Sequence, residues 1–253
     1  MYTASNLPRP AFDEVGTVEW RPWGAVVTFK ESVARTFAER ARIRNEQTEN
    51  AIEREHPTPV HTEGRSQVEI HYEGVLAEEA AALTLARTEA ELTDFRHQLA
   101  ETMPGGRAYD LRIPTEKGDR LVEIRGTMYV TGMLTLRPPQ RIFSCHVYVL
   151  GATAAAKEPP GPLGSLWPIC VRGWTDIEHY RDQGVYCRLK ADGDPLFSLP
   201  QWELEPLGTF WPSLPDVRYA PPQEVPACEF VHQGPLQRDW VRGEDEVPQL
   251  QLI

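Results

Sequence analysis

One stretch of the chain alternates apolar and polar side chains for sixteen positions, and this pattern constrains the fold most. The stretch is residues 121–136, "LVEIRGTMYVTGMLTL". Its even positions carry Val122, Ile124, Met128, Val130, Leu134 and Leu136, and its odd positions carry Glu123, Arg125, Thr127, Tyr129, Thr131 and Thr135. A period of two predicts β-strand with one buried and one exposed face. Because sixteen residues would span about 50 Å, we expect Gly126 and Gly132 to bend or bulge the ribbon into two strands that meet at a kink.

The N-terminal part predicts a hairpin followed by a helix. Residues 16–31 predict the β-hairpin, because Val18 and Trp20 alternate with polar neighbours and "RPWG" supplies turn residues. Apolar residues then recur at helical spacing, so residues 32–55 predict a helix. Its apolar stripe becomes thin after Ala41, and we expect the helix to begin docked on the core and to end as an exposed arm or a mobile insertion.

Between this helix and the ribbon, the patterns predict a strand, a second helix and a short strand. Residues 65–74, "RSQVEIHYEG", alternate and predict a strand. Residues 76–102 predict a helix that lies on a sheet, ended by "PGG". Its apolar stripe contains Leu85, Leu92, Phe95 and Leu99. Residues 107–113 predict a strand, "PTEKGD" a turn into the ribbon, and residues 141–151 a closing strand.

This order predicts an α+β fold that is mainly β: an antiparallel β-sandwich with a flanking helix, formed by residues 1–151. After Gly151 the composition changes, and "ATAAAKEPPGPLG" is typical of a linker. Residues 152–253 are rich in Pro and Trp, which predicts an irregular β region without long helices or central strands. We expect a short β module around "WPICVRGW" and "GVYCRLKADGDPLFSL". An extended tail from about Trp202 to Ile253 is expected to pack along another surface.

Charge and composition exclude several classes of function. A net charge of −11 disfavours nucleic acid as a partner, because such affinity comes chiefly from Lys and Arg on phosphates. The chain has no run of about 18 apolar residues and no basic-then-apolar N-terminus. We therefore expect neither a membrane span nor a secretory signal. The four cysteines stand far apart, which predicts reduced, buried thiols and neither a disulfide framework nor a zinc site.

No motif for a phosphate loop, a zincin or a nucleophile elbow occurs, so we expect no enzyme, no catalytic residue and no cofactor. Cys145 and His146 are adjacent on a predicted strand, so their side chains point to opposite faces and cannot form a nucleophile and base pair. A metal site that includes Cys228 and His232 remains an alternative. The spacing of its candidate ligands matches no standard zinc pattern, and we expect no metal.

Large aromatic side chains are the best candidates for a binding surface. They are costly to leave in water, and exposed aromatic platforms bind protein partners or sugars. The residues predicted to bind a partner are Trp174, Trp202, Trp211, Trp240 and Tyr129. An alternative function is a carbohydrate-binding or receptor-binding module in which Trp174, Trp202 and Trp211 are the platforms.

The order of elements over about residues 64–152 resembles the N-terminal domain of the distal tail proteins of long-tailed bacteriophages, which are similar to tail-tube subunits. The segments that carry the resemblance are "GRSQVEIHYEGVLAEEAAALTLARTEAELTDF", "HQLAETMPGGRAYDLRIPTEKGDRLVEIRGTMYVTG" and "RIFSCHVYVLGA". It implies a β-sandwich that assembles into a ring, commonly of six subunits, with the C-terminal part facing adsorption or baseplate proteins. The charged insertion at residues 32–56 and the Pro/Trp-rich tail depart from the family's pattern.

The sequence thus predicts a structural virion protein, a subunit of a ring in a phage tail as distal tail, tube or baseplate connector. Its expected partners are further copies of itself and other tail or baseplate proteins. The ribbon of residues 121–136 is expected to build a sheet that continues across subunits, because such edges are usually hidden by assembly.

Overall fold

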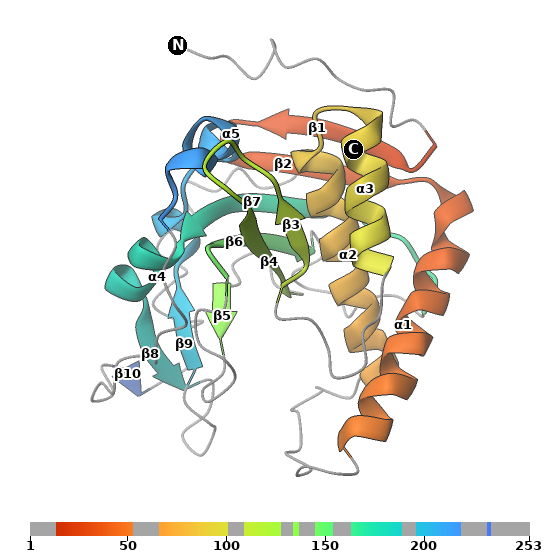
Figure 1. Cartoon of the computed structure of the whole chain (residues 1–253). Coiled ribbons are helices and arrows are strands. Elements are labelled where there is room, and N and C mark those ends of the chain that lie inside the picture. The colour runs from red at the N-terminus through yellow and green to blue at the C-terminus, as the bar shows by residue number, and fades with distance from the viewer. Residues whose placement is uncertain are drawn as a thin grey trace.

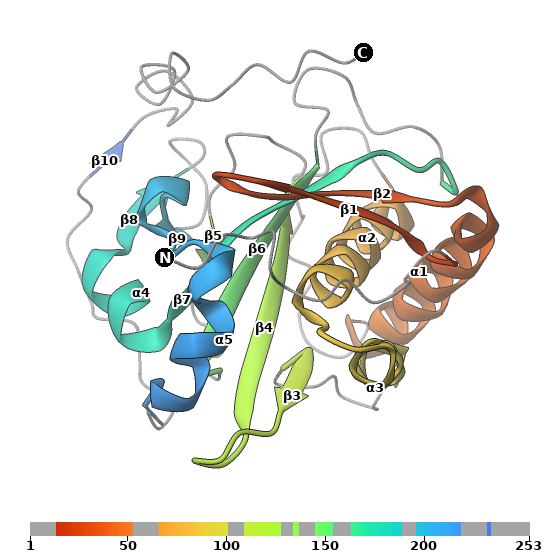
Figure 2. The same ribbon diagram turned by 90° about the horizontal axis from the view of Figure 1, so that it is seen from above.

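The computed structural model describes residues 14–52, 66–100, 109–127, 134–136, 145–153, 163–188, 196–218 and 232–233. This part of the chain has a mixed α/β fold built around a curled six-stranded sheet, sheet A (Figure 1). Figure 2 shows α1, α2 and α3 together on one side of sheet A, and α4 and the smaller sheet B on the other. The expected combination of helices and strands is confirmed, but the antiparallel β-sandwich is not.

Sheet A has the strand order β1-β2-β7-β6-β4-β3. The strands are β1 (Gly16–Arg21), β2 (Gly24–Phe29), β7 (Ile169–Asp176), β6 (Val147–Thr153), β4 (Arg120–Thr127) and β3 (Leu111–Ile113). Strands β1 and β2 form the predicted hairpin, with Arg21 opposite Gly24. Neighbouring strands are antiparallel except β4 and β6, which are parallel.

Strand β7 comes from the predicted C-terminal module, yet it lies inside sheet A between β2 and β6. The boundary that we predicted at residues 151 and 152 falls within β6. The change in composition there therefore does not separate the strands of the two predicted parts, which share one sheet.

The predicted strand at residues 65–74 is wrong, because these residues form the start of helix α2 (Gln67–Leu85). Ser66 caps the helix: its Oγ accepts a hydrogen bond from Glu69 N at 3.4 Å, while Ser66 N donates to Glu69 Oε2 at 2.7 Å. This capping box is a signal for a helix start that outweighs the alternation of a short apolar pattern. From Tyr72 onward α2 is buried on nearly all sides, so it lacks the one-sided stripe that identifies a surface helix.

The predicted helix at residues 76–102 is two helices, α2 and α3 (Glu89–Ala100). The chain turns between them, and Thr88 Oγ1 accepts a hydrogen bond from Glu91 N at 3.1 Å at the start of α3. The four predicted stripe residues Leu85, Leu92, Phe95 and Leu99 are nevertheless all buried. Helix α1 (Glu31–Ile52) matches the predicted helix at residues 32–55, and its Phe37, Ala38 and Ala41 are buried in the core.

The ribbon of residues 121–136 divides into two strands that belong to different sheets. Strand β4 lies in sheet A, whereas β5 (Leu134–Leu136) lies in sheet B; residues 128–133 are outside the described part. Gly126 lies in a close contact, because a Cβ on it would stand 2.9 Å from Ala77 Cβ on α2.

The register shift of sheet A lies between β6 and β7 at Leu150 and Gly151. Inside β6, the residues of both faces are buried, including Tyr148.

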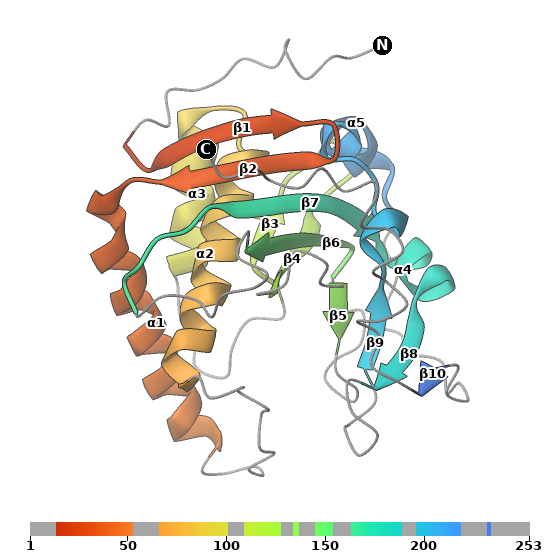
Figure 3. The same ribbon diagram turned by 180° about the vertical axis from the view of Figure 1, so that it is seen from behind.

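Sheet B has the order β10-β8-β9-β5 and lies beside α4 (Ile177–Gln183), as Figure 3 shows. Strands β8 (Val185–Arg188) and β9 (Leu196–Leu199) come from the second segment of the predicted β module and pair antiparallel, and β10 (His232–Gln233) is parallel to β8. Among the described residues, none of the helices combines the length and the apolar composition that a membrane span requires.

The expected extended tail folds back onto its own chain over residues 202–218. Short 3₁₀ turns and α5 (Phe210–Ser213) place Leu207, Phe210 and Leu214 in the main core. Glu205 forms a backbone bridge with Trp174 of β7. The expectation that the tail packs along another surface is wrong for this segment, and the rest of the tail, apart from β10, lies outside the described residues.

Two glycine substitutions test the close contact between α2 and sheet A. Gly126→Ala should destabilise the protein by about 1–3 kcal/mol, because its methyl group overlaps Ala77. Gly74→Ala is the matched control: its Cβ meets nothing within 4 Å, and alanine inside a helix stabilises by about 0.5–1 kcal/mol. Urea unfolding of both variants measures the two effects. Equal stabilities of the two variants would contradict the close contact.

Candidate functional site

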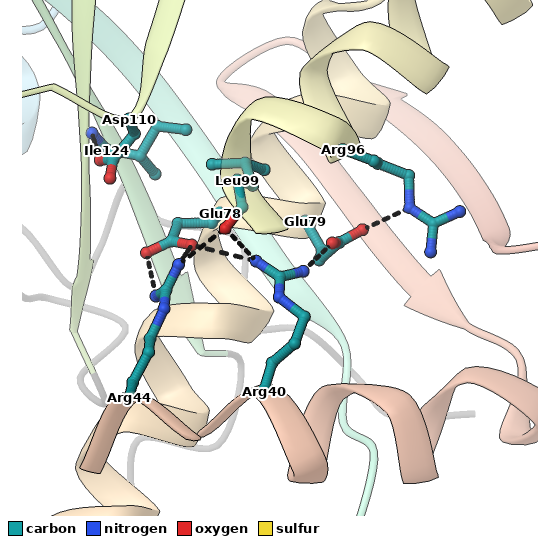
Figure 4. Close-up of polar contacts among 8 residues, drawn as sticks. All are labelled: Arg40, Arg44, Glu78, Glu79, Arg96, Leu99, Asp110 and Ile124. Atoms are coloured by element: carbon teal, nitrogen blue, oxygen red, sulfur yellow. Dashed lines mark hydrogen bonds and ion pairs between the residues drawn. The ribbon is translucent and has the colours of Figure 1, made fainter. Parts of the chain in front are cut away.

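A cluster of acidic and basic side chains lies between three helices (Figure 4). We call it the arginine–glutamate cluster; its members are Arg40 and Arg44 of α1, Glu78 and Glu79 of α2, and Arg96 of α3. Residues four apart on a helix share a face, so Arg40 and Arg44 both point at α2. The side chain of Glu79 is only 1% exposed and that of Glu78 9%.

The charged groups of this cluster have one another as hydrogen-bond partners at short distances. Arg44 donates two hydrogen bonds to Glu78, from Nη1 to Oε1 at 2.6 Å and from Nη2 to Oε2 at 2.5 Å. Glu79 pairs with Arg40 and also accepts from Arg96 Nε at 3.0 Å. Both Arg40 and Arg44 donate to the carbonyl oxygen of Leu99, at 3.1 and 3.2 Å.

These contacts join three helices to one another. The carbonyl of Leu99 lies in the last turn of α3, where backbone oxygens have no partner within the helix. The hydrogen bonds from Arg40 and Arg44 to this carbonyl hold the end of α3 against α1. The same two arginines pair with Glu78 and Glu79 and so hold α2 in place. We interpret the arginine–glutamate cluster as a helix clamp, because its charged side chains form ion pairs with one another across the three helices.

A second group of ionisable side chains surrounds strand β4. Asp110 Oδ2 accepts a hydrogen bond from Ile124 N at 2.6 Å, which extends the hydrogen bonding of the strand beyond β3. Burial raises the pKa of Asp110 well above its usual value, and the charges of Glu123 and Glu78 raise it further. Burial also raises the pKa of Glu123, against the lowering effect of Arg125, whose guanidinium lies 2.8 Å from it.

The cysteine and histidine that the sequence places side by side have different partners. Cys145 Sγ lies 3.9 Å from Glu123 Oε2, whereas His146 Nδ1 accepts a hydrogen bond from Leu121 N at 2.9 Å. Burial and the charge of Arg120 lower the pKa of His146. This agrees with the expectation that the two do not form a nucleophile and base pair. Cys145 and Cys170 are buried free thiols, as predicted for the cysteines. Within the described residues, no three His, Cys, Asp or Glu side chains are grouped so that they could hold a metal ion.

Two of the predicted partner-binding tryptophans anchor the chain to itself. Trp174 is buried, and its Nε1 donates to Thr209 Oγ1 at 3.0 Å and to Pro206 O at 3.2 Å. The expectation that Trp174 offers a surface to a partner is therefore wrong. Trp211 is half-buried, donates from Nε1 to Leu85 O at 2.8 Å, and carries the guanidinium of Arg87 3.7 Å above its ring.

Trp202 alone among the described candidates is strongly exposed, with 64% of its surface accessible. Tyr129 and Trp240 lie outside the described residues. The structure thus does not bring the five predicted residues together into one site within the part that it describes.

The two edges of sheet A differ in a way that sequence reasoning missed. At β3, the side chain of Gln98 on α3 takes the place of a neighbouring strand: Arg112 N donates to its Oε1 at 2.7 Å, and its Nε2 donates to Arg112 O at 3.2 Å. At the other edge, β2 is the only strand of the described residues that pairs with β1. One edge is therefore covered by an amide, and the other presents a regular strand.

No family model matches this chain, and no curated protein or solved structure is significantly similar to it.

Removing the carboxylate of Glu79 tests the helix clamp. Glu79→Gln leaves Arg40 and Arg96 without their shared carboxylate in a largely buried place, and should cost about 3 kcal/mol of unfolding free energy. Glu39→Gln breaks the exposed pair with Arg42 and should cost less than about 0.5 kcal/mol. Chemical denaturation of both variants compares them. A loss at Glu79 as small as that at Glu39 would show that the clamp contributes nothing.

The raised pKa of Asp110 predicts a pH dependence of stability with a definite sign. A carboxyl group whose pKa is higher in the folded state binds its proton more tightly there, so its contribution is greatest below its usual value of 3.8 and is lost as pH rises through the raised pKa. Asp110→Asn keeps an oxygen for Ile124 N but has no charge to bury. The variant should therefore gain stability relative to the natural chain as the pH rises.

Urea unfolding of both proteins at about pH 4.5 and pH 7 measures this gain. The charged neighbours Glu123, Glu78 and Arg125 are present in both proteins, so the comparison isolates the effect of the Asp110 carboxyl group. A stability difference that does not change between the two pH values would contradict the raised pKa.

Proposed function

We propose that this chain is a non-catalytic structural subunit that assembles with further copies of itself. The observation that carries the proposal is the edge strand β1, which is six residues long and pairs along its whole length with β2. Exposed strand edges are templates for pairing with another chain, and folded proteins usually cover them. This chain covers the opposite edge with Gln98, yet in the described part no strand or side-chain amide does the same at β1.

The arrangement of the ionisable groups supports a role without catalysis. The arginine–glutamate cluster holds α1, α2 and α3 together, and Cys145 and His146 have separate partners. Asp110 is hydrogen-bonded to the backbone of β4. Each of these polar groups has a contact that explains its place in terms of folding.

We further propose that the assembly is a ring in a phage tail, as distal tail, tube or baseplate connector, with other tail or baseplate proteins as partners in the virion. Support for this comes from the resemblance in the order of elements, of which β3, the turn after it, β4 and β6 retain the expected succession. The first element of that order, residues 65–74, is helical, so the support comes from the later elements. This proposal includes the β-sandwich fold that the resemblance to that family implies.

The alternative of a carbohydrate-binding module has lost part of its basis. Of its three platforms, Trp174 is buried and Trp211 lies under Arg87, which leaves Trp202. Sugar binding by stacking generally uses rings that a ligand can reach, and a single exposed ring favours this function less than the edge strand favours assembly.

Size-exclusion chromatography with light scattering, followed by negative-stain imaging of the full chain, tests the proposal. We expect a discrete oligomer at a protein concentration of about 100 µM. A chain that is still monomeric at this concentration would have a self-association dissociation constant near the millimolar range or weaker. Rings would support the tail assignment. A discrete oligomer without rings would support self-assembly and reject the ring, and a strict monomer would reject both.

A further inference from the structure

We propose that Asp110 is a pH-sensitive latch on the β3 edge of sheet A. With its carboxyl group protonated, Asp110 fastens the start of β3 to β4; when the group ionises, this edge of the sheet opens more often. The inference goes beyond the proposed function and does not depend on self-assembly, because every contact that carries it lies within one copy of the chain. Figure 4 shows Asp110 beside Ile124 of β4, with the pair of Glu78 and Arg44 toward the helices.

Asp110 joins the start of β3 to β4 through its backbone and through its side chain. Its N–H donates to the carbonyl oxygen of Val122 at 2.9 Å, and its Oδ2 accepts a hydrogen bond from Ile124 N at 2.6 Å. It comes directly before β3, which is only three residues long. Asp110 thus adds two hydrogen bonds at the end of a short edge strand, where local opening of a sheet costs least.

Other contacts keep β3 docked when the latch is released. On its outer side, the side-chain amide of Gln98 bonds to both N and O of Arg112. On its inner side, Leu111 and Ile113 are buried in the main core. Ionisation of Asp110 therefore changes how often the β3 edge opens and does not remove the strand from the sheet.

The charges around Asp110 disfavour its ionised form. Glu123 of β4 and Glu78 of α2 are its acidic neighbours. The guanidinium groups nearby each pair with one of these carboxylates: Arg44 of α1 bonds to Glu78 at 2.5 and 2.6 Å, and Arg125 of β4 lies 2.8 Å from Glu123. Among the described residues, no basic side chain bonds to the carboxyl group of Asp110 itself.

Thermodynamic linkage gives the direction of the switch. Burial is the largest cause of the raised pKa of Asp110, followed by the charges of Glu123 and Glu78, while the hydrogen bond from Ile124 N and the charge of Arg125 oppose it. When the edge opens, water reaches the carboxyl group and its pKa returns toward the usual 3.8. The equilibrium constant for opening then rises with pH between the two pKa values, by up to about tenfold per pH unit, and levels off above the higher one. The edge is therefore most tightly closed at low pH and loosens as the pH rises.

Hydrogen exchange of the full chain, followed by mass spectrometry between about pH 5 and about pH 8, tests the latch. Protection factors are corrected for the intrinsic pH dependence of exchange. We expect those of peptides covering residues 109–113 and 120–124 to fall at least about tenfold over this range. Peptides that cover β2 are the internal reference and should keep their protection, because β2 is separated from β3 by three strands of sheet A.

Three substitutions identify the group responsible. Asp110→Asn keeps an oxygen for Ile124 N and cannot ionise, so protection of the β3 edge should no longer change with pH. Glu123→Gln removes an acidic neighbour while Asp110 stays in place, so the fall should level off at a lower pH and be smaller in total. Glu116→Gln is the matched control, because it removes an exposed carboxyl group from the turn between β3 and β4 and should behave as the natural chain does.

Each outcome supports or overturns the latch. A fall at the β3 edge that Asp110→Asn abolishes and Glu123→Gln reduces supports it. Protection of the natural chain that does not change with pH overturns it, as does an equal fall in the β2 peptides or a fall that persists in Asp110→Asn. Circular dichroism shows whether the variants fold. If Asp110→Asn does not, Glu123→Gln and Glu116→Gln decide, and equal falls in these two overturn the latch.

Discussion

The structure depends on the close approach of α2 to sheet A. Ala77 lies against Gly126 of β4 and Gly151 of β6, where a Cβ would come within 2.9 and 3.2 Å of the Ala77 Cβ. Because neither glycine has a side chain, the helix lies directly on the strands and is buried on nearly all sides. The same burial carries Glu78 and Glu79 into the interior, where a carboxylate is costly unless it is paired.

The arginine–glutamate cluster follows from that position. Arg40 and Arg44 of α1 and Arg96 of α3 supply the charges that Glu78 and Glu79 require. The packing of α2 thereby determines where the other two helices lie, and α3 in turn delivers Gln98 to the edge of β3. A helix seated on two glycines thus leads, through paired charges, to a sheet whose β3 edge is covered by Gln98.

Local patterns predicted the elements whose partners are near in sequence. The hairpin of β1 and β2, the docked start of α1 and the β structure around β8 and β9 were all found, because turn residues and short apolar patterns determine them. The strand predicted at residues 65–74 failed, since a helix buried on all sides has no stripe and its capping box at Ser66 was overlooked. Neither the place of β7 within sheet A nor the internal docking of Trp174 could be predicted, because both depend on contacts between distant segments. The ion pairs of Glu79 depend on such contacts too.

The position of β7 also determines when the protein can fold during synthesis. Ala25 of β2 pairs with Val171 of β7, so the N-terminal hairpin leaves the ribosome long before its neighbour in the sheet exists. Until that strand emerges, the nascent chain exposes the apolar faces of the hairpin and of the helices that will cover it. Contacts between such distant residues slow folding and extend the period in which a chain aggregates. Efficient production of this chain is therefore expected to be sensitive to how quickly translation proceeds from the first strands to residue 176.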